Sequence, residues 1–390
     1  MTCENRPRVP VEYKYISADN HLDLLWVPKN AWQDRVAARF KDAAPKVVET
    51  ENGTFWEWEG KLRGPSADGR DNAKHRQHFA NMGVQTPEGS LPPSDPKVFL
   101  EHMDMAGIYS AVIYGFTRKP NFADPELWRE CYRAYNDFLL DFDSYAPERI
   151  LAPPQIPVKF PEDAGAEFER VVQRGAKAVE FVVFDAAKPI IDPVWEPLWA
   201  AAEEADVPIC CHIGDGAGVP YPINERGALF AHFSVSPFAV AKAIPEFIFG
   251  GVLERHPKLR LSFVECRIGW LPFLIYWMDR QVDPRAHREP DPYVKLSLIP
   301  SEYVKRQMTF TFEDDMIGAR LLDQDWAYIG DSAIWGADYP HGQGVWPNPE
   351  PTMAELFAGK DPALQREITF DRAARFFNIR IPSPAAAGEG

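Results

Sequence analysis

Four short segments of the chain carry ionisable side chains of the types that bind divalent metals. Asp19 and His21 stand two residues apart in ADNHLD, and His212 follows an apolar run in ICCHIGDG. Glu265 closes the apolar run LSFVE, and Asp338 stands in GADYPH. Imidazole nitrogens together with carboxylate oxygens suit Zn²⁺, Mn²⁺ or Fe²⁺. Alternate side chains of an extended segment point the same way, so Asp19 and His21 can face one ion.

Each of these residues also has a plainer interpretation. A single His or Asp at the end of a strand is more often a hydrogen-bonding loop residue than a ligand. Glu265 is open to three roles: an acid–base residue whose pKa is raised by burial, a further metal ligand, or a structural partner of Arg267. His341 fits a catalytic or ligand-orienting role, or else a capped turn around Pro340.

Other polar residues are weaker candidates for the site. We expect His232, Arg267 and Trp270 to contact the substrate, although His232 in LFAHFSVSP fits a structural role as well. Glu180 in KAVEFVVF would bridge to a second metal only if it points inward. The sequence has no GxSxG, no GxxxxGK[ST] and no HExxH motif, which argues against several other hydrolase and nucleotide chemistries.

Short apolar runs alternate with amphipathic stretches along the chain, which predicts βαβ units and a parallel sheet. The predicted strands are Lys14–Ala18, Tyr109–Gly115, Ile150–Ile156, Ala176–Val183, Val207–His212, Arg260–Glu265, Met308–Phe312 and Ala333–Ala337. The predicted helices include Glu126–Tyr145, Pro161–Arg174, Val194–Ala205, Pro237–Glu254 and Gly269–Arg280. Eight such strands predict an α/β fold, a (β/α)8 TIM barrel, whose strand ends open on one face and would bring the ionisable residues together. An open doubly wound sheet is the rival, but no GxGxxG follows an early strand.

The longest irregular stretch, residues 46–95, lies between the first and second predicted strands. Trp56 and Trp58 alternate around Glu57 in FWEWEGKLRG, which indicates a small β-hairpin. An insertion of this size after a barrel strand predicts a lid or a subunit contact. We therefore expect one metal-dependent domain over residues 1–381 and a flexible low-complexity tail over 382–390.

Composition narrows the class of protein. The chain has 390 residues with 42 Lys and Arg against 57 Asp and Glu, so no basic excess predicts a nucleic-acid partner. Its five Cys form no CxxC pair, the N-terminal segment has no apolar core, and no uninterrupted apolar stretch approaches the length of a membrane span. These features predict a cytoplasmic protein that does not bind membranes.

The segments ADNHLD, PICCHIGDG and GADYPHGQGVWP resemble the amidohydrolase-related family, whose members include aminocarboxymuconate-semialdehyde decarboxylase-like and resorcylate-type enzymes. FGGVLERHPKLRLSFVECRIGWLPFLIYWMDR and ITFDRAARFFNI resemble it too, so the likeness spans about Lys14 to Ile379. The resemblance implies a (β/α)8 barrel with one divalent metal. Carried over to this chain, the implied ligands are Asp19, His21, His212 and Asp338. Zinc is the default ion; manganese, iron and a second metal stay open.

Two departures from the family bear on the reaction. Many relatives have His-x-His after the first strand, whereas this chain has Asp19-x-His21, and a carboxylate favours harder metals. The well-studied decarboxylases place a catalytic His at the end of strand six, where this chain has Glu265. The first expectation is therefore a hydrolase of a small carboxylate or carbonyl substrate, acting through a metal-activated water, with Glu265, Asp338 and His341 as catalytic residues.

Three alternatives stay open. The first is a non-oxidative decarboxylase of an aromatic or enol-type carboxylic acid. The second is an oxygenase with two metals, and the third is an inactive partner subunit of an active relative. The resemblance also implies a homodimer or another oligomer, with a small molecule as substrate.

Overall fold

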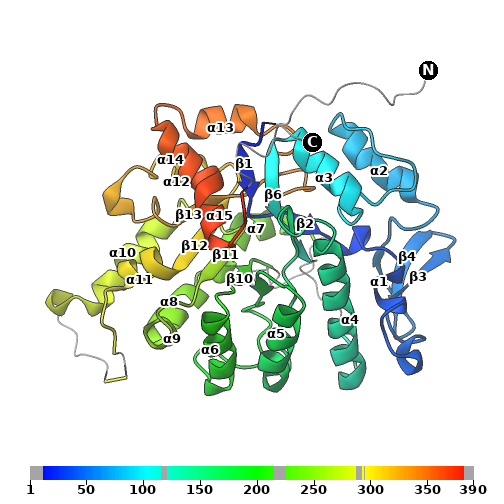
Figure 1. Ribbon diagram of the computed structural model, residues 1–390, viewed down its shortest axis with the longest axis horizontal. Coiled ribbons are helices and arrows are strands. Elements are labelled where there is room, and N and C mark those ends of the chain that lie inside the picture. Colours follow the sequence, from blue (N-terminus) through cyan, green and yellow to red (C-terminus); the bar gives the residue numbers. More distant parts are fainter. Residues whose placement is uncertain (1–11, 116–120, 215–224, 287–291, 294, 382–390) are drawn as a thin grey trace.

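The computed structural model describes residues 12–115, 121–214, 225–286, 292–293 and 295–381. Parallel strands near the middle of the molecule are surrounded by helices (Figure 1). These strands are β1 (Tyr15–Ser17), β6 (Ile108–Val112), β8 (Ile150–Leu151), β9 (Val179–Glu180), β10 (Ile209–His212), β11 (Leu261–Val264), β12 (Met308–Phe312) and β13 (Ala333–Trp335). Each lies inside a predicted strand or begins next to one, although most are shorter. The predicted tail over 382–390 falls outside the described residues.

The strands form two parallel sheets that continue into each other. Their orders are β1-β6-β8 and β13-β12-β11-β10-β9. A parallel bridge between Gln155 and Glu180 joins the β8 side to β9. On the other side the Ala18 N–H donates to the Trp335 carbonyl at 3.0 Å. The two sheets are therefore neighbours on both sides, and because their strands are parallel, the strand C-termini point to the same end of the molecule.

Some of the helices between the strands begin where the sequence provides capping residues. The helices are α1 (Asn30–Gln33), α2 (Asn72–Asn81), α3 (Pro96–Met105), α4 (Pro125–Asp143), α5 (Ala164–Gln173), α6 (Glu196–Glu204), α7 (Ala228–Val235), α8 (Ala243–Phe249), α9 (Val252–Arg255), α10 (Leu271–Val282), α11 (Pro300–Gln307), α12 (Met316–Ala319), α13 (Glu350–Leu356), α14 (Pro362–Arg366) and α15 (Arg372–Phe376). Asp-Pro pairs start α3, α4 and α14, where the Asp carboxylate accepts a backbone N–H and the Pro ring fits the first helical position.

The predicted helix over 237–254 is divided in the structure. It consists of the 3₁₀ turn η6 (Ser236–Val240), α8 and α9. Gly251 separates α8 from α9 with a left-handed φ of 72°, a conformation that glycine adopts at little steric cost. The predicted segment is thus helical, but it is interrupted after η6 and again at Gly251.

Residues 46–95 form a small unit of their own beside the parallel strands. Strands β3 (Lys46–Thr50), β4 (Gly53–Trp58) and β5 (Lys61–Pro65) make an antiparallel sheet, so the predicted hairpin around Glu57 is present. Trp56 is fully buried, and its indole N–H donates to the Leu24 carbonyl at 2.8 Å. Helix α2 reaches the candidate site, because His78 Nε2 lies 2.6 Å from the Pro340 carbonyl oxygen.

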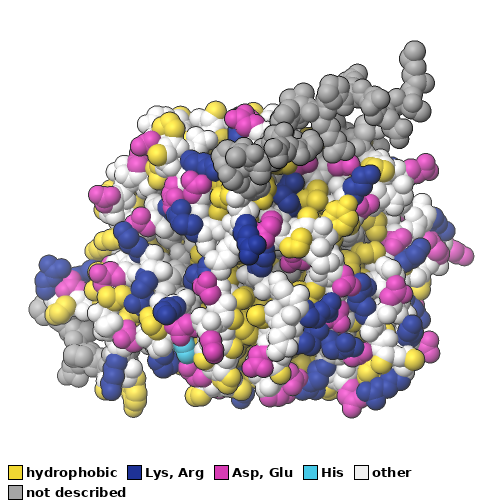
Figure 2. Space-filling model, in the orientation of Figure 1, with side chains coloured by type: hydrophobic (Ala, Val, Ile, Leu, Met, Phe, Trp, Pro, Cys, Tyr) yellow, Lys and Arg dark blue, Asp and Glu magenta, His cyan; other side chains and the backbone are white. Residues whose placement is uncertain are grey.

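The face of the molecule in Figure 2 carries side chains of both charges, with acidic and basic groups interspersed. Among the described residues, one helical stretch, Ala228–Phe249, has the length and composition of a membrane span. The stretch bends through η6, and core helices of globular proteins have the same composition, so this finding alone gives little support for a membrane location.

Candidate metal centre and active site

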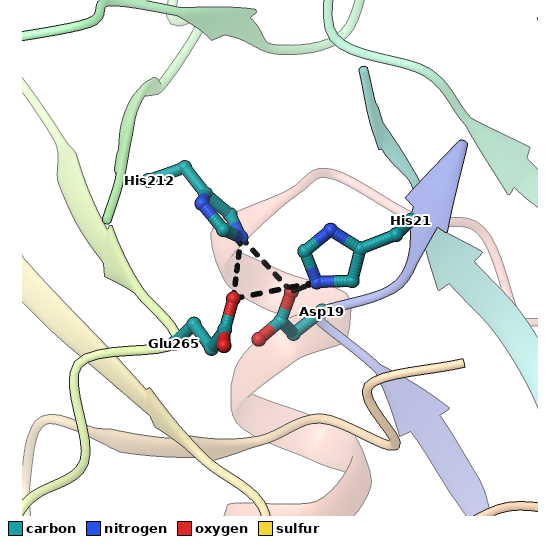
Figure 3. Close-up of side chains that lie close together, drawn as sticks. All are labelled: Asp19, His21, His212 and Glu265. Atoms are coloured by element: carbon teal, nitrogen blue, oxygen red, sulfur yellow. Dashed lines mark ion pairs between the residues drawn. The ribbon is translucent and has the colours of Figure 1, made fainter. Parts of the chain in front are cut away.

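Four side chains from separate strands point toward one another at the C-terminal ends of the strands (Figure 3). Asp19 follows β1, His21 begins the short strand β2 (His21–Leu22), His212 ends β10, and Glu265 follows β11. One nitrogen or oxygen atom from each lies within 4.8 Å of all the others. The Asp19 Oδ1 atom is 3.4 Å from His21 Nε2 and 3.5 Å from His212 Nε2. Glu265 Oε2 is 3.5 Å from His21 Nε2 and 3.3 Å from His212 Nε2.

The donor set of this cluster fits a divalent metal. Within the described part of the chain, neither Asp19 oxygen nor His212 Nε2 has a hydrogen-bond partner of normal geometry, although all three atoms are buried. Buried polar atoms are rarely left without a partner unless an ion or water completes them. The His212 Nδ1–H donates to the Ile213 carbonyl at 2.5 Å, which leaves Nε2 free to bind a metal. The cluster therefore supports a divalent-metal site.

Asp338 and His341 lie directly beside the cluster. Asp338 Oδ1 is 2.9 Å from His21 Nε2 and 2.8 Å from His341 Nδ1. The other ring nitrogen of His341 is 3.1 Å from Asp23 Oδ2. The His341 ring stacks on the His21 ring with centroids 4.0 Å apart. A chain of contacts thus runs from the cluster through Asp338 and His341 to Asp23.

The concentration of carboxylates changes the pKa values of the site. Burial and the charge of Asp338 raise the pKa of Asp19 to about 8. The same two causes raise the pKa of Glu265 well above its usual range. Burial also lowers the pKa of His21 to about 4, so this imidazole is neutral at pH 7. A neutral imidazole is the form that binds metals.

His341 is protonated at neutral pH. Burial alone would lower its pKa, but hydrogen bonds to Asp23 and Asp338 raise the pKa of His341 to about 12. The same contacts from His21 and His341 outweigh burial and hold the pKa of Asp338 below its ordinary value. His341 therefore links two carboxylates as a cation.

The backbone at this end of the strands is unusual. Glu265 and Asp338 have φ angles of 57° and 55°, in the left-handed region that residues with a Cβ rarely adopt. Such conformations cluster at functional sites, where surrounding contacts hold them. Gly336 allows a close approach, because a Cβ there would lie 2.4 Å from the Asp19 Cβ. The glycine in WGAD thus lets β13 and the end of β1 pack together.

A cavity of about 360 Å³ opens next to the cluster. Its lining residues are His21, Asp23, Ile213, Gly214, His232, Phe233, Ser236, Glu265, Asp338, His341, Gly342 and Gln343. A volume of this size suits a small ligand. His232, expected to contact the substrate, lines this cavity. The other two expected contacts lie elsewhere: Arg267 pairs with Glu313 and Asp314, and Trp270 donates to the Cys266 carbonyl at 2.7 Å.

Two carboxylates near the centre were missed by reasoning from the sequence. Glu313 directly follows β12 and is fully buried, and burial with the charges of Asp19 and Asp338 raises its pKa despite the nearby Arg267. Asp23 lines the cavity and holds His341. The signal for Glu313 was present, since MTFTFED places an acid at the end of a predicted strand, as LSFVE does for Glu265.

Comparison with known proteins identifies the family. Residues 104–379, well over half of the chain, match the sequence model of the Amidohydrolase family. The chain belongs to this family. It is accordingly an enzyme of the amidohydrolase superfamily.

Solved structures of the family resemble the chain over nearly its whole length. An amidohydrolase from Mycobacterium avium subsp. paratuberculosis is 21% identical, with a TM-score of 0.66 over 95% of this chain and 99% of its own. A 2,6-dihydroxybenzoate decarboxylase from Rhizobium is 18% identical, with a TM-score of 0.61 over 94% and 99%. A dihydroxybenzoic acid decarboxylase from Polaromonas sp., solved with manganese and 2-nitroresorcinol, is 17% identical, with a TM-score of 0.62 over 97% and 100%. These amidohydrolase-family structures share the fold of the chain, which implies the TIM barrel.

Proposed function

We propose that the protein is a metal-dependent, non-oxidative decarboxylase of a small aromatic or enol-type carboxylic acid. The observation that carries the proposal is the cluster of Asp19, His21, His212 and Glu265 at the edge of a small cavity. Two solved structures of similar fold are decarboxylases of dihydroxybenzoic acids. The initial expectation of hydrolysis rested on Glu265 in place of a strand-six His, and these relatives favour the decarboxylase alternative over it.

We further propose a closed (β/α)8 barrel with residues 46–95 as an insertion after its first strand, and one bound cation. Asp19, His21, His212 and Glu265 would hold the ion, with Asp338 at its edge. Two carboxylates beside two imidazoles make a harder donor set than an all-His site, and one relative was solved with manganese. Manganese is therefore our choice over the zinc expected from the sequence. When bound, the ion would supply a positive charge that draws together the carboxylate and a neighbouring oxygen of the substrate.

The residues of the chain would then manage one proton. When CO₂ leaves, its bonding electron pair stays on the carbon, and that carbon must take up a proton. We assign this transfer to His341, which lines the cavity and carries a proton at neutral pH. Asp338 and Asp23, whose carboxylate oxygens lie 2.8 Å and 3.1 Å from its two ring nitrogens, would orient the imidazolium, and water would return the proton to the ring after each turnover.

The decisive experiment is turnover by manganese-loaded protein. We would offer 2,6-dihydroxybenzoate and other ortho-hydroxybenzoates, and separately a panel of esters, amides and lactones. Release of CO₂ with formation of the phenol, lost in Asp338→Asn, would support the proposal. Hydrolysis of the second panel without CO₂ release would overturn it and restore the hydrolase interpretation. Two redox-active metals per chain with oxygen uptake would instead favour the oxygenase alternative.

A further inference from the structure

The loop that carries Glu265 makes several polar contacts with one neighbouring segment. This loop, residues 265–270, connects β11 to α10, and the neighbouring segment, residues 311–315, is the end of β12 and the turn after it. Both segments lie at the end of the strands where the metal cluster is found. Of the loop, Glu265 is the residue that lines the cavity.

The loop needs external support because of its backbone conformation. Glu265 and Arg267 have φ angles of 57° and 59°, both in the left-handed region. Residues with a Cβ adopt this region at a steric cost, so contacts elsewhere must stabilise it. Two such residues within three positions make this loop unlike an ordinary strand-to-helix connection.

Segment 311–315 supplies such contacts to four residues of the loop. The Glu265 N–H donates to Thr311 Oγ1 at 2.6 Å, and the Arg267 guanidinium pairs with Glu313 and with Asp314. Asp315 Oδ2 accepts two successive N–H groups, from Ile268 at 2.8 Å and from Gly269 at 2.7 Å.

The packing at Gly269 shows how close the two segments are. A Cβ on Gly269 would lie 3.0 Å from Asp315 Oδ1, so a larger residue would crowd the Asp315 carboxylate. Glycine at this position keeps the two hydrogen bonds short.

We propose that Asp315 and the Arg267–Glu313 ion pair are positioning residues that fix the Glu265 carboxylate at the metal centre. Asp315 acts through the loop backbone and does not line the cavity, whereas the Arg267–Glu313 pair holds the loop and also lies close enough to Asp19 to act on its charge. This inference deepens the proposed function and rests on its assignment of Glu265 as a ligand, but it does not depend on which reaction the enzyme performs. It also gives Arg267 a structural role in the loop, whereas the sequence predicted that this residue contacts the substrate.

The test is a double-mutant cycle on Mn²⁺ affinity, measured by calorimetry without substrate. Asp315→Ala should weaken Mn²⁺ binding by about ten- to a hundredfold, the usual effect of losing a group that orients a ligand. Added to Glu265→Gln, the same substitution should cause no further loss, because the ligand it positions is already gone. An equal loss in both backgrounds, or none in the wild-type background, would overturn the inference.

Two further variants keep the test independent of folding. Asp315 also accepts the Gly318 N–H at 2.9 Å and so caps α12, which means that Asp315→Ala can unfold the chain. Arg267→Gln removes the ion pair and leaves that cap intact, and it should weaken Mn²⁺ binding clearly less in the Glu265→Gln background than in the wild type; the part that remains reports its direct effect on Asp19. Asp314→Asn is the matched control, because this side chain is 55% exposed and Glu313 still holds Arg267; it should bind Mn²⁺ as the wild type does.

The turnover experiment and the Mn²⁺ affinity cycle can fail independently. If the enzyme does not decarboxylate its substrates but the two substitutions are non-additive, the proposed function is wrong and the positioning role stands. If it decarboxylates but the two losses of affinity are additive, the proposed function stands and the positioning role is wrong.

Discussion

At the scale of single residues, the centre is dominated by negative charge. Asp19, Asp23, Glu265, Glu313 and Asp338 gather there, whereas the cations in contact with them are Arg267 and His341 among the described residues. Buried like charges raise one another's pKa, so several of these carboxyls bind protons when no cation is present. A divalent cation resolves the repulsion, and this is the physical reason the cluster fits a metal.

The pH dependence of metal binding follows from Asp19. Its pKa of about 8 means that the carboxyl is largely protonated at pH 7 without metal, and a cation must displace that proton. Affinity for Mn²⁺ should therefore rise by about tenfold per pH unit or more from pH 6 to about 8, since the raised pKa of Glu265 adds a second proton that the cation displaces. His21, with a pKa near 4, stays neutral over this range and adds no slope. Calorimetry in buffers of different ionisation enthalpy measures the released proton, and an affinity independent of pH would contradict this assignment.

His341 should affect turnover more than metal binding. Its folded pKa is raised from 6.5 to about 12, so the stability from its ion pairs is complete below pH 6.5 and is lost only as the pH rises toward 12. At pH 7–9 the cation is therefore present. We expect His341→Gln to lower kcat by about a hundredfold or more while metal content stays near wild type. His75→Gln, on α2 and outside the cavity lining, is the control, and equal losses in both variants would argue against a role in proton transfer.

At the scale of elements, the site depends on how closely neighbouring strands approach. Asp19 and Asp338 belong to opposite ends of the chain, yet the Asp338 N–H donates to the Asp19 carbonyl at 2.9 Å. Gly336 makes this contact sterically feasible. A metal centre built on such strand ends is more rigid than one built on loops alone.

Gly336→Ala should disturb the site through packing. The added methyl would lie 2.4 Å from the Asp19 Cβ and 3.0 Å from its backbone nitrogen, so the backbone must move. We expect a loss of about 1–3 kcal/mol in the free energy of unfolding together with reduced metal content. Gly165→Ala is the comparison: Gly165 lies in α5, and its Cβ would lie 3.7 Å from the Cβ of Pro197 in α6, an ordinary contact distance. It should leave the metal content unchanged and should not lower the free energy of unfolding. Urea unfolding and elemental analysis measure the two effects, and a fully metallated, stable Gly336→Ala protein would contradict this account.

At the scale of the whole molecule, segments far apart in sequence stabilise one another through the centre. The cluster joins residues at the ends of β1, β10 and β11 and at the start of β2. Helix α2 of the 46–95 unit contacts the Pro340 carbonyl through His78. We interpret the 46–95 unit as a support for the site loop, and a lid role stays a prediction.

Metal removal should therefore destabilise the entire fold. A ligand that binds the native state at a hundredfold excess over its Kd contributes about 2.7 kcal/mol, so chelation should lower the Tm of the protein by several degrees. Re-addition of Mn²⁺ should restore it. His212→Gln should show a smaller response or none, because it lacks one ligand. Calorimetric scans with and without chelator test this, and identical Tm values would argue against a tightly bound ion.

The sequence by itself determined the alternation of strands and helices and the positions of Asp19, His21, His212, Glu265 and Asp338. Those features are local: hydrophobic runs set the strands, and an ionisable residue at the end of a run is visible in the one-dimensional pattern. The hairpin around Glu57 was local for the same reason. The predicted strand lengths were less accurate, because a strand ends where its backbone hydrogen bonds to the neighbouring strand end, and the sequence does not show that point.

Only the tertiary structure decided which of these groups touch. It placed Glu265 within 4.8 Å of the donor atoms of Asp19, His21 and His212, with Asp338 2.9 Å from His21. It also brought Asp23 to His341 and paired Arg267 with Glu313. Those pairings depend on the approach of side chains separated by tens to hundreds of residues, and on left-handed backbone at Glu265 and Asp338 that no sequence pattern signals. Charge repulsion and burial act over a few ångströms in space, so their consequences for pKa and metal binding exist only once the strands have been brought together.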